Sequence, residues 1–454
     1  MTISQLLADA AARGARYLET LPTRSVAPDA QAVDALSTFD HPFPDRPTSP
    51  TAVLQQLDEA GSPATVATAG GRYFGFVIGG SLPAALAANV LAAAWDQHTG
   101  LVIASPATAA IEAIALRWLL DALTLPASCA AGFVTGATMA NFTCLAAARH
   151  ALLQRAGWDV EAQGLFGAPE ITVVVGDEVH VSALKALSLL GLGRDRVIRV
   201  PTDAQGRMRA ELVPPLDDRT ILCLQAGNVN TGAFDPIAAL VTRARAAHAW
   251  VHIDGAFGLW AAAAPARAAL VAGVDHADSW ALDAHKWLNV PYDSGVAICR
   301  DEEALRSAMA VRAAYLVQGA EREPSEYTPE LSRRARGVEV WAALLSLGRS
   351  GLADLIERNC RMAARFAAGL RDAGYEILND VVLNQVLVSF GDEEATRRVV
   401  AGVQKDGTCW CGGTVWHGRA AMRISVSSWA TTDDDVELSI AAMLRVASEI
   451  NAAR

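Results

Sequence analysis

The feature that most constrains the fold is an alternation of short apolar runs and helical stretches beginning near residue 131. Seven β-rich runs follow one another, at residues 131–135, 171–175, 196–200, 220–225, 250–254, 279–283 and 295–299. Helical stretches separate several of them, and one is expected to begin at Pro236 with Asp235 as its cap. Parallel strands need such crossovers, so the pattern predicts an α/β fold with a mostly parallel, doubly wound sheet of seven strands.

The segments on either side of this block have a different character. Residues 3–20 show an amphipathic helical pattern, and four prolines then mark an extended linker. The C-terminal part begins with a long helical stretch near 336–372 and continues as strand, helix and strand. We therefore expect an N-terminal arm and linker over 1–60, a large domain over 61–335 and a small α+β domain over 336–454.

Composition excludes several classes of protein. Hydrophobic residues make up 52% and charged residues 19% of the chain, as in a soluble protein with a substantial core. The net charge of −11 disfavours nucleic acid and anionic membranes as partners. No apolar run reaches the roughly 18 residues of a membrane span. The N-terminus has no basic start and no signal-peptide pattern, and the seven scattered cysteines suit a reducing compartment. We expect a cytoplasmic protein without a metal site.

Lysine is scarce, which makes each lysine informative. Of the 38 basic residues only three are lysines, Lys185, Lys286 and Lys405. Arginine does not deprotonate in proteins, so only these side chains can act as amine nucleophiles. Lys286 follows an apolar run and lies between His285 and Trp287. A solvated surface charge is the ordinary interpretation of a lysine, but these flanks favour the desolvated amine that Schiff-base chemistry needs.

A second stretch, AGFVTGATMANF, combines a strand, a turn and a helix. The strand is expected to end at Thr135, and the turn of Gly136, Ala137 and Thr138 leads into a helix that begins near Met139. Backbone N–H groups at a helix N-terminus, with a hydroxyl beside them, can bind a phosphate. The simpler alternative is an ordinary turn in which Thr138 caps the helix.

Two further residues follow apolar strands. Asp254 ends the strand in WVHIDGAFGLW, and the small Gly255, Ala256 and Gly258 leave room beside it. Open α/β sheets place ligand groups at this end of a strand, although an aspartate can also simply cap the next turn. His180 lies between a strand and a helix, where a packed or capping histidine is the alternative to a functional one.

Taken together, these residues suit one cofactor. Pyridoxal 5′-phosphate needs an anion site for its phosphate, a carboxylate for its ring nitrogen and an amine for its aldehyde. Asp254 and Lys286 are 32 positions apart, which allows one strand–helix–strand step between them. Neighbouring strand ends can then present both residues to one ligand, with His180 as a flat ring nearby. The sequence predicts a pyridoxal-phosphate site.

The same stretches resemble a known family, the pyridoxal-phosphate-dependent group II amino acid decarboxylases related to aromatic-L-amino-acid decarboxylase and glutamate decarboxylase. The resemblance runs from about Tyr73 to Trp429, and its most specific stretch is ALDAHKWLNVPYDSG. It also includes RYFGFVIGG, VTGATMAN, VHIDGAFG and AMRISVSSWATT. It implies the fold type I architecture of aspartate aminotransferase, in a homodimer whose active sites lie at the subunit interface.

The resemblance implies roles for individual residues. Lys286 resembles the lysine that forms the Schiff base, and Asp254 the carboxylate on the pyridine nitrogen. His180 resembles the imidazole stacked on one face of the ring, and Ala256 the small residue on the other. The full set of cofactor-binding residues implied in this way is Gly136, Ala137, Thr138, His180, Asn228, Asp254, Ala256, His285 and Lys286.

The resemblance also reaches the substrate. Tyr327 falls in a stretch that resembles the mobile loop whose tyrosine protonates the carbanion, and Arg423 resembles an arginine that meets a substrate carboxylate. Tyr73 and Phe74 lie in the segment that resembles the entrance of the substrate pocket. The implied activity is decarboxylation of an amino acid, with an aromatic side chain favoured, to give CO₂ and an amine.

Other functions remain open at this point. The same cofactor supports aminotransfer, carbon–carbon bond cleavage and aldehyde-forming oxidative decarboxylation, and a non-catalytic protein can use the same fold. Retention of Lys286, Asp254 and His180 together favours an enzyme. Met139 stands where an acidic residue is common in the family and Asp96 where asparagine is frequent, so the substrate cannot simply be copied from relatives.

Overall fold

The computed structural model describes residues 1–310 and 322–452, which form two compact units. One unit comprises Met1–Gly80, Arg365–Leu378 and Leu387–Arg454. The other comprises Ser81–Ala364 and Asn379–Val386. We describe each unit by itself, and the division at residues 60 and 335 stays a prediction.

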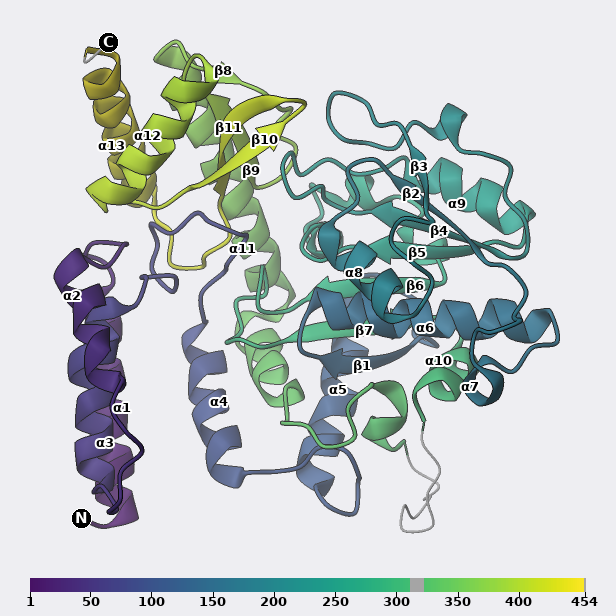
Figure 1. Ribbon diagram of the computed structural model, residues 1–454, viewed down its shortest axis with the longest axis horizontal. Helices are drawn as coiled ribbons and strands as arrows, with labels where there is room; N and C mark the ends of the chain where they lie inside the picture. The colour runs from purple at the N-terminus through teal and green to yellow at the C-terminus, as the bar shows by residue number, and fades with distance from the viewer. Residues whose placement is uncertain (311–321, 453–454) are drawn as a thin grey trace. The chain divides into compact units, whose positions relative to one another are not determined.

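The larger unit is built on a seven-stranded sheet (Figure 1). Its strands are β1 Ala130–Val134, β2 Thr172–Gly176, β3 Ile198–Val200, β4 Thr220–Gln225, β5 Trp250–Asp254, β6 Ser279–Asp283 and β7 Gly295–Cys299. The spatial order is β1-β7-β6-β5-β4-β2-β3. Neighbouring strands from β3 to β6 are parallel, and β7 runs antiparallel to both β6 and β1. The predicted fold class is confirmed.

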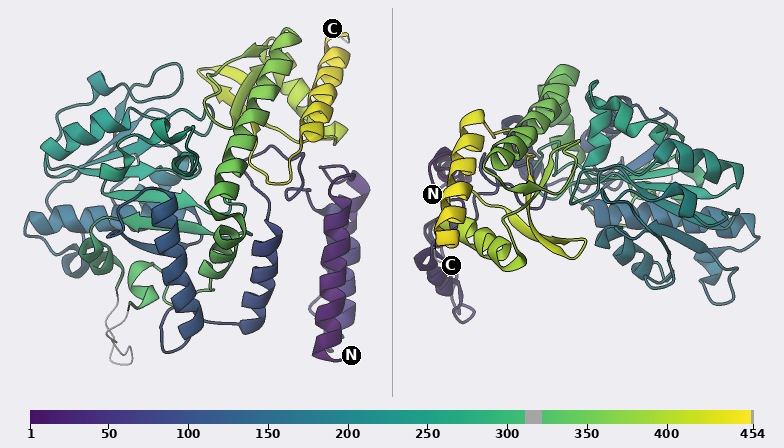
Figure 2. Two further views of the ribbon diagram at one scale, coloured as in Figure 1. Left: turned by 180° about the vertical axis from the view of Figure 1, so that it is seen from behind. Right: turned by 90° about the horizontal axis from the view of Figure 1, so that it is seen from above.

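Helices lie on both faces of this sheet (Figure 2). The helices of this unit are α4 Pro83–Trp95, α5 Pro106–Ala122, α6 Ala137–Arg155, α7 Val160–Gln163, α8 Val181–Leu189, α9 Ile237–Ala246, α10 Glu302–Met309 and the first part of α11 Gly337–Asp372. Helix α6 packs on β5, β6 and β7 and also contacts α8 and α10. Its apolar side chains, such as Leu145 and Leu152, are fully buried with Val175 and Leu187 in one core cluster. These contacts hold α6, and with it the N-terminus of the helix, in place on the sheet.

Two helix starts differ from the sequence predictions. Helix α6 begins at Ala137 rather than near Met139, and no side chain caps it. Helix α9 begins at Ile237, so the prediction that Asp235 caps a helix starting at Pro236 is wrong. Both carboxylate oxygens of Asp235 instead accept backbone N–H bonds, from Met208 and Gln225, each at 2.7 Å. A carboxylate that is used in this way is not available to cap a helix.

The smaller unit contains a four-stranded sheet in the order β10-β11-β9-β8. Its strands are β8 Glu376–Ile377, β9 Gln385–Ser389, β10 Gly412–Trp416 and β11 Arg419–Ser425. Its helices are α1 Ile3–Thr20, α2 Ala30–Asp34, α3 Pro50–Gln56, α12 Glu393–Asp406, α13 Asp433–Ala452 and the end of α11. Helix α12 packs on β11 and α13. The helix predicted over residues 3–20 is confirmed.

The long helix expected near 336–372 is interrupted. Gly348 has φ 58° and ψ −176° within α11, so two helical segments meet there at a kink. Positive φ is easily adopted by glycine and rarely by other residues, which explains why the break falls at this position. In the described ranges, none of the helices combines the length and apolar character needed to cross a bilayer.

Candidate active site

The carboxyl ends of β5 and β6 bring Asp254 and Lys286 onto neighbouring loops. In the parallel pairing of these strands, Asp254 lies opposite Ala281. Strand β6 then ends at Asp283, whose N–H donates to the carbonyl of Ala256 at 3.0 Å. Parallel strands end at the same edge of a sheet, so the loops after β5 and β6 are joined there, as the sequence spacing suggested.

Of the three lysines, Lys286 is the one that is largely buried and paired with a carboxylate. Its Nζ lies 2.9 Å from Oδ2 of Asp283, and only 17% of its side chain is exposed. Lys185 on α8 and Lys405 on α12 are both exposed. A largely buried side chain that a buried carboxylate holds in place fits the position inferred for Lys286, and the solvated alternative fits the other two lysines.

The predicted phosphate cradle at the N-terminus of α6 lies beside Asp283, the partner of Lys286. The N–H of Ala137 donates to Oδ1 of Asp283 at 2.6 Å, so this end of the helix already holds a negatively charged oxygen. A Cβ at Gly136 would lie 3.2 Å from His285 Cε1. A Cβ at Gly295 would lie 2.4 Å from the Cα of Gly136. Glycine is therefore needed for the close approach, and Thr138 follows in the first helical turn, partly exposed.

His285 lines the same cradle. Its ring stacks on Tyr292 with centroids 4.3 Å apart, and its Nδ1 accepts the N–H of Ser294 at 3.2 Å. Burial lowers the pKa of His285, and the nearby Asp283 only partly opposes this effect. A neutral ring with Nδ1 as acceptor carries its proton on Nε2, the nitrogen that lies 3.7 Å from Asp283 Oδ1.

Asp254 is a buried carboxylate without a cationic partner among the described residues. Its Oδ1 accepts the N–H of Ala256 and its Oδ2 accepts Nδ2–H of Asn141, both at 3.2 Å. The residue is 7% exposed. A buried charge is costly unless it is paired. The protonated ring nitrogen of pyridoxal phosphate is a cation that fits this carboxylate.

His180 caps helix α8 and belongs to the same hydrogen-bonded network. Its Nδ1 accepts the N–H of Ser182 at 3.3 Å and lies 2.7 Å from the hydroxyl oxygen of Ser182. That hydroxyl in turn accepts Nδ2–H of Asn141 at 3.2 Å. The capping role weighed from the sequence is present, and Asn141 links it to Asp254. Stacking of His180 on a cofactor ring stays a prediction.

Sequence reasoning missed three members of this network, Asn141, Ser182 and His252. It also missed Asp283, the partner of Lys286 and of the Ala137 N–H. Asn141 lies one turn after Ala137 on α6, and His252 precedes Asp254 by two on β5, which places both side chains on the same face of the strand. These periodicities were visible in the sequence. The residues to which these side chains are hydrogen-bonded lie on other helices and strands, and no local sequence pattern predicts those contacts.

Asn228 has a different local role. Its Oδ1 accepts the N–H groups of Asn230 and Thr231 at 2.9 and 3.2 Å, which closes the turn after β4. Its Nδ2 donates to Gln225 Oε1 at 3.4 Å. The side chain therefore holds a loop at the same edge of the sheet, and its contact with cofactor or substrate stays a prediction.

Tyr327 lies in a short 3₁₀ turn, Pro324–Tyr327, and is 3% exposed. Its hydroxyl donates to Glu302 Oε1 at 2.5 Å, and the guanidinium of Arg322 lies 4.1 Å from its ring centroid. Burial, followed by the contact with Glu302, raises the pKa of Tyr327 to about 12. The sequence suggested a mobile loop, whereas the described tyrosine packs in the core beside α10. Its role as proton donor stays a prediction.

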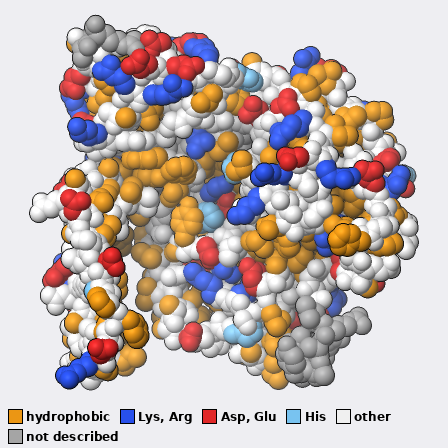
Figure 3. All heavy atoms as spheres, in the orientation of Figure 1, with side chains coloured by type: hydrophobic (Ala, Val, Ile, Leu, Met, Phe, Trp, Pro, Cys, Tyr) orange, Lys and Arg blue, Asp and Glu red, His pale blue; other side chains and the backbone are white. Residues whose placement is uncertain are grey.

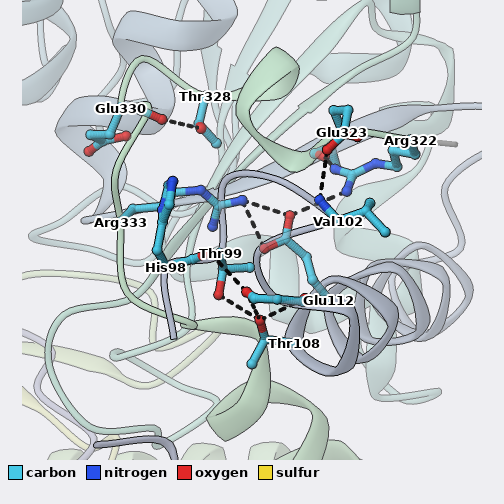
Figure 4. A network of polar contacts seen from close by, with 12 residues as sticks. His98, Thr99, Val102, Thr108, Glu112, Arg322, Glu323, Thr328, Glu330 and Arg333 are labelled. Atoms are coloured by element: carbon cyan, nitrogen blue, oxygen red, sulfur yellow. Dashed lines mark hydrogen bonds and ion pairs between the residues drawn. The ribbon is translucent and has the colours of Figure 1, made fainter. Parts of the chain in front are cut away.

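A buried ion-pair network holds the segment around Tyr327 (Figure 4). Glu112 on α5 is fully buried and accepts two bonds from Arg333 Nη2, at 2.8 and 2.9 Å. Arg322 also contacts Glu112, at 3.3 Å. The N–H of Val102 donates to Glu323 Oε2 at 2.8 Å. The residues on both sides of Tyr327 are thus anchored to the α4–α5 region.

The predicted substrate residues Tyr73, Phe74 and Arg423 belong to the smaller unit. Tyr73 stacks on Trp410 with centroids 5.1 Å apart, and Phe74 is fully buried against Phe366. Burial raises the pKa of Tyr73 to about 12 and lowers the pKa of Arg423. Arg423 and Tyr73 are close enough for each to influence the ionisation of the other. Their contact with substrate stays a prediction.

The fold and these residues define a class of enzyme. A seven-stranded, mostly parallel sheet with a lysine, a buried carboxylate and an anion-binding helix end at one edge is the arrangement of fold type I pyridoxal-phosphate enzymes. A family model described as "Pyridoxal-dependent decarboxylase conserved domain" matches residues 34–391. The chain belongs to this family of pyridoxal-phosphate-dependent amino acid decarboxylases.

Individual relatives agree with this assignment. Aromatic-L-amino-acid decarboxylase of Bacillus atrophaeus is 29% identical over 316 residues, which is 66% of this chain and 63% of the relative. Tryptophan decarboxylase 1 of Oryza sativa subsp. japonica is 28% identical over 422 residues, 83% of this chain and 80% of the relative. The solved structure of Oryza sativa TDC with PLP and tryptamine matches with a TM-score of 0.89 at 23% identity, over 98% of both chains.

The residues present fit pyridoxal 5′-phosphate, which is the cofactor of this chain. The side chain of Lys286 suits the aldehyde of that molecule, and the carboxylate of Asp254, which has no cationic partner among the described residues, suits its ring nitrogen. The N-terminus of α6, where the N–H of Ala137 donates to the carboxylate of Asp283, suits its phosphate. The chain is a pyridoxal-phosphate-dependent carboxy-lyase that acts on an amino acid.

Proposed function

We propose that this enzyme removes the α-carboxylate of an aromatic L-amino acid and releases CO₂ and the corresponding amine. The observation that supports the chemistry most directly is the pairing of Lys286 with Asp283 next to the α6 N-terminus, with Asp254 on the adjacent strand. The preference for an aromatic side chain is supported by the names of the relatives from Bacillus atrophaeus and rice.

In this proposal, different residues of the larger unit hold different parts of the cofactor. When bound, pyridoxal phosphate supplies an electron-withdrawing ring that stabilises the charge left on Cα as CO₂ departs. Lys286 supplies the amine that holds the cofactor, and Asp254 keeps the ring nitrogen protonated through its negative charge. Ala137 and Thr138 bind the phosphate, and His180 supports one face of the ring.

The remaining assignments concern the substrate. Arg423 is assigned to the substrate carboxylate, because the stretch AMRISVSS resembles the family segment whose arginine meets that group and a guanidinium is a strong donor to carboxylates. Tyr73, stacked on Trp410, is assigned to the entrance of the pocket. Tyr327 is assigned to the delivery of the proton to Cα.

The enzyme is also proposed to act as a homodimer. Helix α1 is amphipathic, yet none of its residues is buried, and Ile3, Leu7 and Leu18 are exposed. Figure 3 shows hydrophobic side chains on the surface of the N-terminal helices. Amphipathic helices normally cover their apolar face, and a second copy of the chain is the proposed cover. Sedimentation velocity measures this directly.

A cytoplasmic location is proposed from the cysteines. All seven are free thiols, and all are buried. Proteins of oxidising compartments commonly use cysteines in disulfides, whereas a reducing compartment keeps them as thiols.

The activity is tested with the purified holoenzyme and each aromatic amino acid, by measuring CO₂ and amine together. We expect equal amounts of the two products. Lys286→Ala should fold and lose turnover and the borohydride-reducible link to the cofactor, whereas Lys185→Ala, which alters an exposed lysine, is the matched control. A keto acid as product would indicate an aminotransferase instead, and an aldehyde would indicate oxidative decarboxylation.

A further inference from the structure

We propose that Asn141 is a positioning residue that orients both Asp254 and His180 through one directional chain of hydrogen bonds beginning at Trp250. The inference rests on the cofactor roles proposed above for Asp254 and His180. It assigns to one amide the joint control of the carboxylate that faces the ring nitrogen and of the imidazole that supports the ring.

The chain runs through the core beneath the site. Nε1–H of Trp250 donates to the hydroxyl oxygen of Ser279 at 2.9 Å, and that oxygen lies 2.9 Å from Nδ1 of His252. Nε2 of His252 lies 2.7 Å from Oδ1 of Asn141. Ser279, His252 and Asn141 are all fully buried, so water does not substitute for these contacts.

The direction of each hydrogen bond, from donor to acceptor, follows from the chemistry of Asp254 and His252. The carboxylate of Asp254 only accepts, so the NH₂ group of Asn141 faces it and the amide oxygen faces His252. Nε2 of His252 must then carry the proton. Burial lowers the pKa of His252 to about 4, so the ring is neutral near pH 7 and Nδ1 accepts the hydroxyl proton of Ser279.

The second N–H of Asn141 extends the chain to His180. It donates to the hydroxyl oxygen of Ser182 at 3.2 Å. The backbone N–H of Ser182 points at Nδ1 of His180 at 3.3 Å, so that nitrogen is an acceptor. The hydroxyl of Ser182 therefore donates to Nδ1 as well, at 2.7 Å, and the ring proton of His180 belongs on Nε2.

The position of Asn141 on α6 connects these hydrogen bonds to the proposed phosphate site. Asn141 follows Ala137 by four residues, one turn along the helix, so it lies on the same face as the phosphate cradle. One turn of α6 thus carries the anion site, the link to the carboxylate and the link to the imidazole. Helix α6 is rigidly packed on β5 to β7, so the three groups are held in a fixed relation.

The test compares four variants of the holoenzyme. Asn141→Ala removes both branches. His252→Leu leaves both branches in place but removes the donor to the amide oxygen, together with the acceptor of the Ser279 hydroxyl. His252→Gln restores an N–H donor near the position of Nε2. Thr143→Val is the matched control, because it removes a buried hydrogen bond, to the carbonyl of Met139, from the same helix. Melting temperature, cofactor dissociation constant, kcat and KM are measured for each.

We expect Asn141→Ala to weaken cofactor binding and lower kcat by about tenfold or more each, as loss of a bond to a charged group does, with KM changed much less. His252→Leu should follow in the same direction, and His252→Gln should recover most of the loss. Thr143→Val should lower the melting temperature alone. In ¹⁵N-histidine NMR spectra, the Nε2–H form of His180 should dominate in the wild type, and its proportion should fall in Asn141→Ala, where only the backbone N–H of Ser182 still fixes Nδ1 as an acceptor.

Two outcomes would overturn the proposal. One is an Asn141→Ala enzyme that loses thermal stability like Thr143→Val but keeps wild-type cofactor affinity. The other, decisive even if Asn141→Ala does not fold, is an equal effect of His252→Leu and His252→Gln. Cofactor affinity and tautomer are read without substrate, so a wild-type enzyme that binds the cofactor but spares aromatic amino acids would contradict the proposed function alone.

Discussion

At the scale of single residues, the site depends on which charges are paired within the protein and which are not. Lys286 and Asp283 form an ion pair, whereas the buried Asp254 has only hydrogen-bond donors among the described residues. A protein that buries a carboxylate in this way needs a cation from elsewhere. In the proposed site the ring nitrogen of the cofactor supplies it, so the charge of Asp254 is expected to matter more than its shape.

Asp254→Asn tests this distinction between charge and shape. The amide has nearly the same size but no negative charge, so the ring nitrogen is no longer kept protonated. Loss of one partner of a buried ion pair costs about 3–5 kcal/mol, and each 1.4 kcal/mol or so that reaches the transition state lowers the rate about tenfold. We expect kcat to fall by at least about tenfold. Turnover within about twofold of wild type would rule out Asp254 as the ring partner.

At the scale of elements, strands were predictable where burial is complete. The runs at 220–225, 250–254, 279–283 and 295–299 are strands with those bounds, because these central strands are buried on both faces and read as continuous apolar runs. Asp254 and Lys286 could be found because each follows such a run. Asn141, Ser182 and His252 could not be assigned, because their partners lie on other elements.

Helix starts and surface segments were harder to predict, again for a physical reason. Asp235 stands at a position typical of a helix cap, but its carboxylate accepts hydrogen bonds from the backbone N–H groups of Met208 and Gln225 instead. Tyr327 lies in a charged, proline-containing stretch typical of a loop, yet the buried partner Glu112 fixes the flanking arginines. Local composition does not report a buried partner that is distant in the sequence.

The Glu112 network should contribute strongly to stability. Glu112→Ala leaves the buried Arg333 without its carboxylate, so we expect the free energy of unfolding to fall by about 3–5 kcal/mol. Glu393→Ala breaks the exposed pair with Arg397 and should cost about 0–1 kcal/mol. Urea denaturation measures both. A loss for Glu112→Ala no larger than that of the surface control would show that the network does not anchor this segment.

The same segment carries the test of Tyr327. The proton-donor hypothesis predicts that Tyr327→Phe still releases CO₂ but protonates Cα slowly, so that in air part of the product changes from amine to aldehyde. The described phenol donates to Glu302 and has its pKa raised to about 12, so this role requires it to leave that contact. The measurement is the amine-to-aldehyde ratio under air. An unchanged ratio with a lower melting temperature would assign Tyr327 to packing instead.

At the scale of the whole molecule, buried titratable groups make stability depend on pH. The folded pKa of His252 is about 4, below the ordinary value of 6.5, because burial disfavours the charged ring. Asp235 shifts in the other direction, to about 6 from 3.8, because burial disfavours its anion. Between pH 4 and 6.5 the unfolded chain binds a proton at His252 that the folded protein does not. Over that range His252 makes stability fall with falling pH, and Asp235 partly opposes the change.

The variant His252→Gln isolates the first effect, since Asp235 is unchanged in it. We expect the unfolding free energy of the wild type to fall more steeply than that of His252→Gln as pH falls from about 6.5 to about 4, with the difference reaching about 3 kcal/mol. Above about pH 7.5 the two curves should run parallel, because His252 is then mostly neutral in both the folded and the unfolded chain. Urea denaturation at a series of pH values measures the difference. Parallel curves throughout would mean that His252 accepts a proton in the folded protein as readily as in the unfolded chain, and that its burial does not disfavour the charged ring.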